Sequence, residues 1–104
     1  DSPDQLHQRN CTVFADGEVD RSPCGSGTSA RLALLAAEGW VSDSKSLLHE
    51  SIIGTQFVGS IVGSTVEEDR PAVITQVQGS AFRTGEHSFF LDPRDSVGLG
   101  FQLR

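Results

Sequence analysis

The sequence predicts a single α+β domain in which a largely antiparallel sheet accompanies one central helix. One stretch, SARLALLAAEG at residues 29–39, is rich in good helix formers and apolar on most sides. Four β-prone stretches follow it, and apolar and polar residues alternate most clearly in AVITQVQGSAF at residues 72–82. The 104 residues suffice for one small domain.

The part of the chain before the helix carries few signals of regular structure. Residues 1–9 form a polar lead-in, and CTVFA at residues 11–15 is a short β-prone run that ends at an Asp-Gly turn pair. Residues 18–23 are polar and end in a proline, which breaks regular structure. Residues 25–28 then lead into the helix, which should stop at Gly39. Because this helix is apolar on nearly every side, we expect sheet to surround it.

The strands after the helix are separated by turn signals at Gly54, at residues 68–71 and at residues 84–85. We expect these strands at residues 47–53, 56–66, 72–82 and 87–91. Residues 92–104 hold too much glycine and proline to form a regular element.

Composition and charge exclude several classes of function. The formal charge is −6 and the pI is about 4.8, and Lys45 is the only lysine, so the chain lacks the basic stripe of a nucleic-acid binder. No apolar run approaches the roughly 18 residues that a membrane-spanning helix needs. The polar start has no signal-peptide core, and two cysteines make no disulfide framework, so we expect a cytoplasmic protein.

The segment DRSPCGSGTSAR, residues 20–31, carries the strongest signal of chemistry. Cys24 lies where a polar loop meets the helix, and the first N–H groups of a helix lack internal partners and lie at the positive end of its dipole. A thiol at such a position has its thiolate favoured, and the same N–H groups can bind a carboxylate. Asp20, four residues upstream, could face a substrate ammonium group. These groups meet the requirements for chemistry at the α-carbon of an amino acid.

Each of these residues also has an ordinary structural explanation. A lone cysteine is more often a small buried hydrophobe than a catalyst, and Gly25 and Gly27 could be plain turn residues. Asp20 could be a turn or cap residue, and Ser26 or Thr28 could be the N-cap. The start of a helix does not by itself require a cysteine between proline and glycine, so we favour the functional interpretation.

Other motifs fit the sequence badly. GSGTSA matches the glycine pattern of a dinucleotide site, but DRSPC precedes it where that fingerprint needs a hydrophobic strand. His7, His49 and His87 are far apart, and HESII lacks the second histidine of a zinc-binding helix, so we expect no metal site.

The stretch FADGEVDRSPCGSGTSARLALL resembles the second active-site segment of the proline racemase family, which includes 4-hydroxyproline epimerases and trans-3-hydroxyproline dehydratases. The stretches ESIIGTQFVG, PAVITQVQGSAF, GEHSFFLDPRD and GLGFQL follow the same family pattern, so the resemblance covers about residues 10–104. One departure is Ser96, where the family often has proline.

The resemblance implies an enzyme without metal or pyridoxal phosphate, in which two acid/base residues face each other across the substrate α-carbon. It implies that Cys24 is one of the two, that the N–H groups of Gly25 and Ser26 hold the substrate carboxylate, and that Asp20 meets the ring nitrogen. In the dehydratase branch a threonine replaces the cysteine. We therefore expect racemisation or epimerisation of proline or a hydroxyproline, with dehydration of 3-hydroxyproline, or an inactive structural or binding fragment, as the alternatives.

The fold that the resemblance implies is of the diaminopimelate epimerase type, with two lobes that each wrap a barrel-like sheet around a central helix. Residues 1–104 resemble about the last third of such a protein and would form part of its C-terminal lobe, with a last strand that the other lobe could share. The first acid/base residue of the family lies in an N-terminal segment that nothing here matches, and Cys11 is expected in a strand. We therefore expect this chain to need the N-terminal portion or a complementary chain as its partner and to be inactive alone, and the full protein could form a homodimer.

Overall fold

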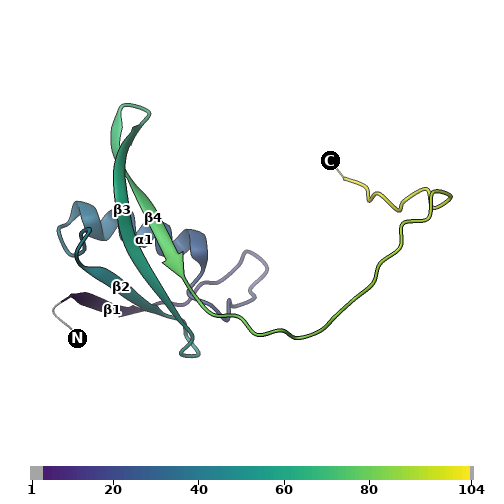
Figure 1. Cartoon of the computed structure of the whole chain (residues 1–104), viewed down its shortest axis with the longest axis horizontal. Coiled ribbons are helices and arrows are strands. Elements are labelled where there is room, and N and C mark those ends of the chain that lie inside the picture. The colour runs from purple at the N-terminus through teal and green to yellow at the C-terminus, as the bar shows by residue number, and fades with distance from the viewer. Residues whose placement is uncertain (1–3, 104) are drawn as a thin grey trace.

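The computed structural model describes residues 4–103, which contain four strands and one helix (Figure 1). In chain order they are β1 (Gln5–Arg9), α1 (Gly25–Ala37), β2 (Ser46–Glu50), β3 (Gln56–Glu67) and β4 (Arg70–Gln78). The strands form one sheet in the order β1-β2-β3-β4, in which β1 runs parallel to β2 and the other two pairs are antiparallel. The prediction of an α+β arrangement with a largely antiparallel sheet is confirmed.

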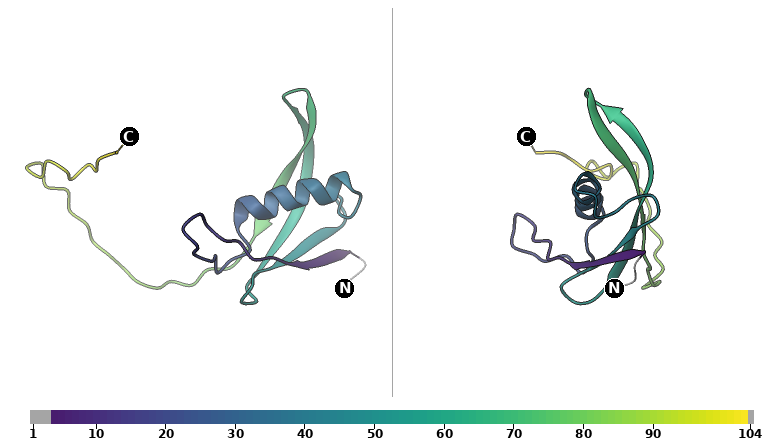
Figure 2. Two further views of the ribbon diagram at one scale, coloured as in Figure 1. Left: turned by 180° about the vertical axis from the view of Figure 1, so that it is seen from behind. Right: turned by 90° about the vertical axis from the view of Figure 1, so that its left-hand side faces the viewer.

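Helix α1 packs on one face of this sheet. Its buried residues Thr28, Leu32 and Leu35 are spaced by four and three positions, which places them on one side of the helix. The core that they join is small and contains the buried hydrophobic residues Leu32, Leu35, Val41, Leu47 and Ile61. Leu34 is 48% exposed, and a view along the helix shows the sheet curving past one side of it (Figure 2). The expectation that sheet surrounds the helix is therefore wrong for residues 4–103.

The helix approaches the sheet closely at Gly59 of β3. A Cβ placed on Gly59 would lie 2.7 Å from Leu32 Cδ1 and 3.3 Å from Thr28 Cγ2. Carbon atoms do not approach one another to 2.7 Å without a shift of the packing. Glycine at this position therefore allows α1 to rest directly on the backbone of β3.

The N-terminal part of the chain differs from expectation. Within the polar lead-in, residues 5–9 form β1, which pairs with β2 from Gln5 opposite Ser46 to Arg9 opposite Glu50. Residues 1–3 lie outside the described residues. The prediction of a strand at residues 11–15 is wrong, because within this run only Val13 forms a bridge, to Val19. Pairing with a distant strand decides strand formation here, and the local sequence pattern does not show it.

The turns and the helix lie closer to their predicted positions. Helix α1 begins at residue 25, four residues before the expected stretch, and ends just ahead of Gly39, which has a φ of 82°. Strand β2 ends at residue 50, so that residues 51–55 form the turn expected around Gly54, whose φ is 88°. A tight turn at residues 68 and 69 joins β3 to β4, as predicted.

Residues 79–103 leave the sheet as an extended segment with no helix or strand (Figure 1). The strand expected at residues 72–82 ends at residue 78. The prediction of a strand at residues 87–91 is wrong, because these residues form no regular element. A β-prone sequence becomes a strand only where another backbone is available to pair with it, and among residues 4–103 nothing pairs with this segment. Its aromatic side chains are 88% to 94% exposed at Phe82, Phe89 and Phe90.

Candidate active site

Cys24 is the N-cap residue of α1 and lies at the junction of loop and helix, where the sequence places it. The alternative that Ser26 or Thr28 is the N-cap is wrong, because both residues lie inside the helix. Its backbone has φ 69° and ψ 127°, and its side chain makes no capping hydrogen bond to the helix. A positive φ is uncommon for a residue other than glycine and persists where the surrounding structure holds it. The side chain is half-buried, so Cys24 is not the small buried hydrophobe of the structural explanation.

The surroundings of Cys24 favour its thiolate. Ser26 lies close by, with its Oγ 3.5 Å from the sulfur, and a hydrogen bond from this hydroxyl is the main cause that lowers the pKa of Cys24. The backbone N–H groups of Gly27 and Ser26 lower the pKa further, while partial burial and the negative charge of Asp20 oppose them. The net effect holds the pKa of Cys24 below the ordinary value for a thiol, as expected for a cysteine at a helix N-terminus.

The first turn of α1 is open to a ligand. Gly25 and Ser26 are exposed, and a Cβ placed on Gly25 would meet no atom within 4 Å. The first intrahelical hydrogen bond in this turn runs from the N–H of Thr28 to the carbonyl of Cys24, at 2.9 Å. The N–H groups ahead of it have no helical acceptor, so the turn can bind an anion beside the thiol.

Asp20 takes part in the structure of the loop that precedes the helix. Its Oδ1 accepts hydrogen bonds from the N–H of Ser22, at 2.8 Å, and from the Ser22 hydroxyl, at 3.0 Å. That hydroxyl in turn accepts the N–H of Cys24 at 3.0 Å. Asp20 therefore has the turn role that the structural explanation allows, while no hydrogen bond within residues 4–103 reaches its Oδ2. One carboxylate oxygen shapes the loop, and the other is available to a ligand.

Sequence reasoning missed the residues that hold this loop from outside. The side-chain amide of Asn10 donates to the carbonyl of Pro23 at 2.7 Å, and the hydroxyl of Thr55 donates to the carbonyl of Arg21. Thr55 belongs to the turn that starts at the buried Ser51, whose hydroxyl lies 2.7 Å from that of Thr55. The ESIIGT stretch thus packs against DRSPC, and nothing in the spacing of the two stretches along the chain could have indicated this contact.

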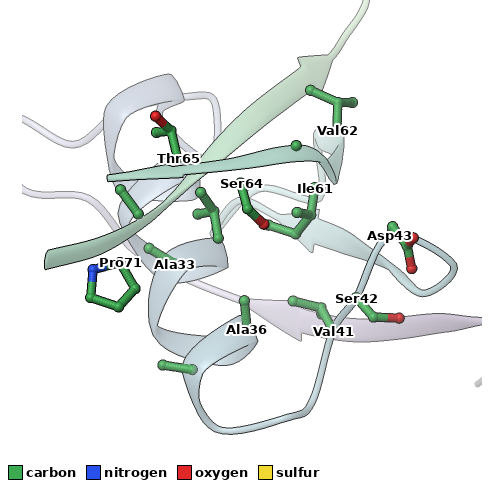
Figure 3. A pocket seen from close by; sticks show the side chains of 14 residues that line it. Ala33, Ala36, Val41, Ser42, Asp43, Ile61, Val62, Ser64, Thr65 and Pro71 are labelled. Atoms are coloured by element: carbon green, nitrogen blue, oxygen red, sulfur yellow. The ribbon is translucent and has the colours of Figure 1, made fainter. Parts of the chain in front are cut away.

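Cavities lie beside both halves of the helix in the part of the chain that the structure describes. A groove of about 590 Å³ separates the C-terminal half of α1 from the hairpin of β3 and β4, and small or apolar side chains such as Ala33, Ala36 and Ile61 line much of it (Figure 3). It lies at the end of the helix away from Cys24. The second cavity, of about 540 Å³, is close to the thiol because Gly27 contributes to its wall; its lining residues are Gln8, Arg9, Asn10, Gly27, Arg31 and His49.

The described residues contain neither a metal cluster nor a helix that could span a membrane. No three His, Cys, Asp or Glu side chains among residues 4–103 gather closely enough to hold a metal ion. No helix in that part of the chain has the length and apolar character needed to cross a bilayer.

Comparison with known proteins identifies the family of this chain. Residues 1–102 match the sequence profile of proline racemase. The chain is 47% identical over 95 residues to trans-3-hydroxy-L-proline dehydratase of Bacillus cereus, which covers 91% of this chain and 28% of that protein. It is 42% identical over 99 residues to 4-hydroxyproline epimerase of Brucella ovis, which covers 95% of this chain and 30% of that protein.

Solved structures agree with the sequence matches. A hydroxyproline epimerase from Agrobacterium vitis, crystallised with trans-4-hydroxy-L-proline, matches with a TM-score of 0.72 and 47% identity over 91% of this chain and 27% of that one. A probable proline racemase from Agrobacterium radiobacter matches with a TM-score of 0.73 and 39% identity, over 91% of this chain and 28% of the other. The chain thus spans less than a third of the length of these relatives. These matches show that the chain belongs to the proline racemase family.

Proposed function

We propose that this chain is the C-terminal part of an enzyme that racemises or epimerises proline or a hydroxyproline at the α-carbon without a cofactor. The observation that carries the proposal is the position of Cys24, a half-buried thiol with a lowered pKa beside the open first turn of α1. Two relatives whose names give a hydroxyproline as substrate, the Bacillus cereus dehydratase and the Brucella ovis epimerase, support proline derivatives as the substrate class.

In the proposed reaction the Cys24 thiolate removes the α-proton, so that the C–H bond breaks and an S–H bond forms. A second acid/base residue, outside residues 1–104, delivers a proton to the opposite face of the same carbon. Negative charge develops on the substrate carboxylate during this transfer, and the N–H groups of Gly25 and Ser26 would stabilise it where it grows. Asp20, through its free Oδ2, would meet the ring nitrogen. In the reverse direction the neutral thiol donates the proton.

For the whole protein we propose the two-lobed architecture of diaminopimelate epimerase. The outward side of α1, with Leu34 48% exposed, and the apolar groove between the helix and the hairpin support it (Figure 3). Strands from the rest of the protein would cover this side of the helix and complete the lobe, and the extended segment after residue 78 would then find a backbone to pair with.

A second candidate reaction is the dehydration of trans-3-hydroxy-L-proline. The 47% identity to the Bacillus cereus dehydratase favours it. The cysteine at position 24 favours epimerisation, because the family resemblance implies a threonine there in dehydratases. A catalytically inactive protein with a binding role remains the alternative from another class.

The test uses the full-length protein and three substrates: L-proline, trans-4-hydroxy-L-proline and trans-3-hydroxy-L-proline. Polarimetry detects racemisation or epimerisation, and chromatography detects the dehydrated product. We expect Cys24→Ala to lower turnover on the order of 10²- to 10⁴-fold, the usual contribution of an acid/base residue, and the matched Cys11→Ala to leave it unchanged. Undiminished turnover in Cys24→Ala would contradict the catalytic assignment, and a wild-type protein inert toward all three substrates would favour the binding alternative.

A further inference from the structure

Thr28 and His49 form a buried polar pair behind the first turn of α1. Thr28 is 0% and His49 3% exposed, and the Thr28 hydroxyl oxygen lies 2.8 Å from His49 Nδ1. Thr28 belongs to the helix and His49 to β2, so the pair joins the helix to the sheet. Buried polar atoms are kept when a hydrogen bond satisfies them, and this contact gives a partner to the Thr28 hydroxyl and to His49 Nδ1. Neither residue has a part in the reaction proposed above.

Thr28 touches both peptide groups that flank Cys24. Its N–H donates to the carbonyl of Cys24 at 2.9 Å, and its hydroxyl lies 3.4 Å from the carbonyl oxygen of Pro23. The second of these contacts is long, but the side-chain amide of Asn10 holds the same carbonyl at 2.7 Å. The peptide group between Pro23 and Cys24 is thus held from two sides, which restricts the rotation that sets φ of Cys24.

The orientation of the Thr28 side chain is fixed by packing as well as by its hydrogen bond. Its methyl carbon Cγ2 faces β3, where a Cβ on Gly59 would be only 3.3 Å away. The hydroxyl therefore points toward His49 and the Pro23 carbonyl. A side chain held at both branches keeps one rotamer.

We propose that His49 and Thr28 are positioning residues for Cys24, and that they hold its backbone at the positive φ that aims the thiol at the first turn of α1. A residue other than glycine keeps such a φ only where its surroundings enforce it. Thr28 contributes to that restraint through its backbone N–H on one side of Cys24 and its hydroxyl on the other, beside the hydrogen bonds of Asn10 and Ser22. Without it, the sulfur would move away from the Ser26 hydroxyl and the Gly27 N–H. The effect on the thiol follows from the geometry alone, whereas the effect on turnover rests on the proposed function.

The experiment compares three single substitutions in the full-length protein. Thr28→Val removes the hydroxyl and keeps the branched shape, and Thr28→Ser keeps the hydroxyl. Thr75→Val is the matched control, because the Thr75 hydroxyl also joins the sheet to α1, where it donates to Ser29 Oγ at 3.0 Å. Unlike the Thr28 hydroxyl, it makes no hydrogen bond to Pro23 or Cys24 among residues 4–103. The readouts are the melting temperature, the pH midpoint of Cys24 alkylation by iodoacetamide, and kcat and KM for the substrate that the protein accepts.

We expect Thr28→Val to move the alkylation midpoint to higher pH and to lower kcat by about 10- to 100-fold, as misplacement of a reacting group does, with a smaller change in KM. Thr28→Ser and Thr75→Val should keep the wild-type midpoint, even where the melting temperature falls. Equal alkylation midpoints in Thr28→Val and Thr75→Val would overturn the proposal, since Thr28 would then only stabilise the fold. A shifted midpoint in a protein that turns over no proline derivative would support the positioning role and count against the proposed function.

A second pair of substitutions decides the matter if Thr28→Val does not fold. His49→Leu removes the hydrogen bond, whereas His49→Asn places an amide near the position of Nδ1. A higher alkylation midpoint in His49→Leu with recovery in His49→Asn supports the proposal. The same midpoint shift in both variants, or in neither, contradicts it.

Discussion

Cys11 and Cys24 show how differently the same side chain is placed within one short chain. Cys11 is exposed and lies outside any strand, although the sequence predicts a strand there. Cys24 lies at a helix N-terminus, where Ser26 and Gly27 lower its pKa. The reactivity of a cysteine follows the fraction present as thiolate, so the two thiols should react at different rates.

We predict that iodoacetamide labels Cys24 faster than Cys11 in the full-length protein at neutral pH. A lowered pKa means that the thiolate of Cys24 forms at lower pH, so its labelling rate rises with pH earlier than that of an ordinary thiol. Ser26→Ala removes the main cause of the lowered pKa and should shift the labelling midpoint of Cys24 to higher pH, and Cys11 serves as the internal reference. Mass spectrometry of labelled peptides measures both.

A planar carboxylate that mimics the substrate tests whether the first turn of α1 binds an anion beside Cys24. Pyrrole-2-carboxylate should protect Cys24 from labelling, because its carboxylate would occupy the open first turn of α1. It should leave Cys11 unprotected. Equal labelling of the two cysteines, with no protection of either, would argue against a tuned site.

At the scale of elements, the contact between α1 and β3 sets where the site lies. The helix rests on Gly59, and the same turn of the helix carries Thr28, which is paired with His49 of β2. The DRSPC loop is held in turn by Asn10, which follows β1, and by Thr55 in the turn before β3. Contacts from β2, from the residue after β1 and from the turn before β3 thus converge on the residues around Cys24.

We predict that Gly59→Ala destabilises the full-length protein by about 1–3 kcal/mol, the usual cost of overpacking a core. The added methyl would lie 2.7 Å from Leu32 Cδ1 and 3.3 Å from Thr28 Cγ2, so the fully buried Leu32 side chain or α1 itself would have to shift. Gly63→Ala in the same strand is the control, because its methyl would lie 3.3 Å from the flexible end of Ile74. Urea denaturation compares the free energies of unfolding, and an equal loss in both variants would contradict the close contact at Gly59.

At the scale of the whole molecule, much apolar surface lies exposed. Among residues 4–103 the core has five buried hydrophobic residues, whereas Phe90, Leu99 and Phe101 are 94%, 90% and 79% exposed on the extended segment. Monomeric proteins rarely expose apolar groups over so long a stretch, and exposed patches of this kind usually mark an interface. The exposed face of α1 and the edges of the sheet add to this surface.

We predict that residues 1–104 alone neither racemise proline nor remain a well-folded monomer. Two-base chemistry requires acid/base residues on both faces of the α-carbon, and only Cys24 is assigned here. The exposed apolar segment should promote association in isolation. Size-exclusion chromatography with light scattering and a polarimetric assay test both points. A clean, active, folded monomer of 11.1 kDa would contradict both points and would mean that these elements already close a core.

The sequence by itself determined the features that depend on neighbours along the chain. Helix α1, the turn at Gly54 and the turn between β3 and β4 depend on local propensity and on positive φ, which a few adjacent residues specify. The position of Cys24 at the start of the helix is local in the same way. The family resemblance rests on such local stretches too, so the sequence alone is enough to name Asp20, Cys24, Gly25 and Ser26 as candidate residues.

Tertiary structure alone decided the features that join distant parts of the chain. Strand β1 is polar and exists because β2, about 40 residues later, offers a parallel partner. The β-prone run at residues 87–91 has no such partner within the described part of the chain and is not a strand. The pairing of Thr28 with His49 joins residues 21 positions apart. Hydrogen bonds between strands and between buried side chains depend on which backbones meet in space, and sequence spacing does not specify that meeting.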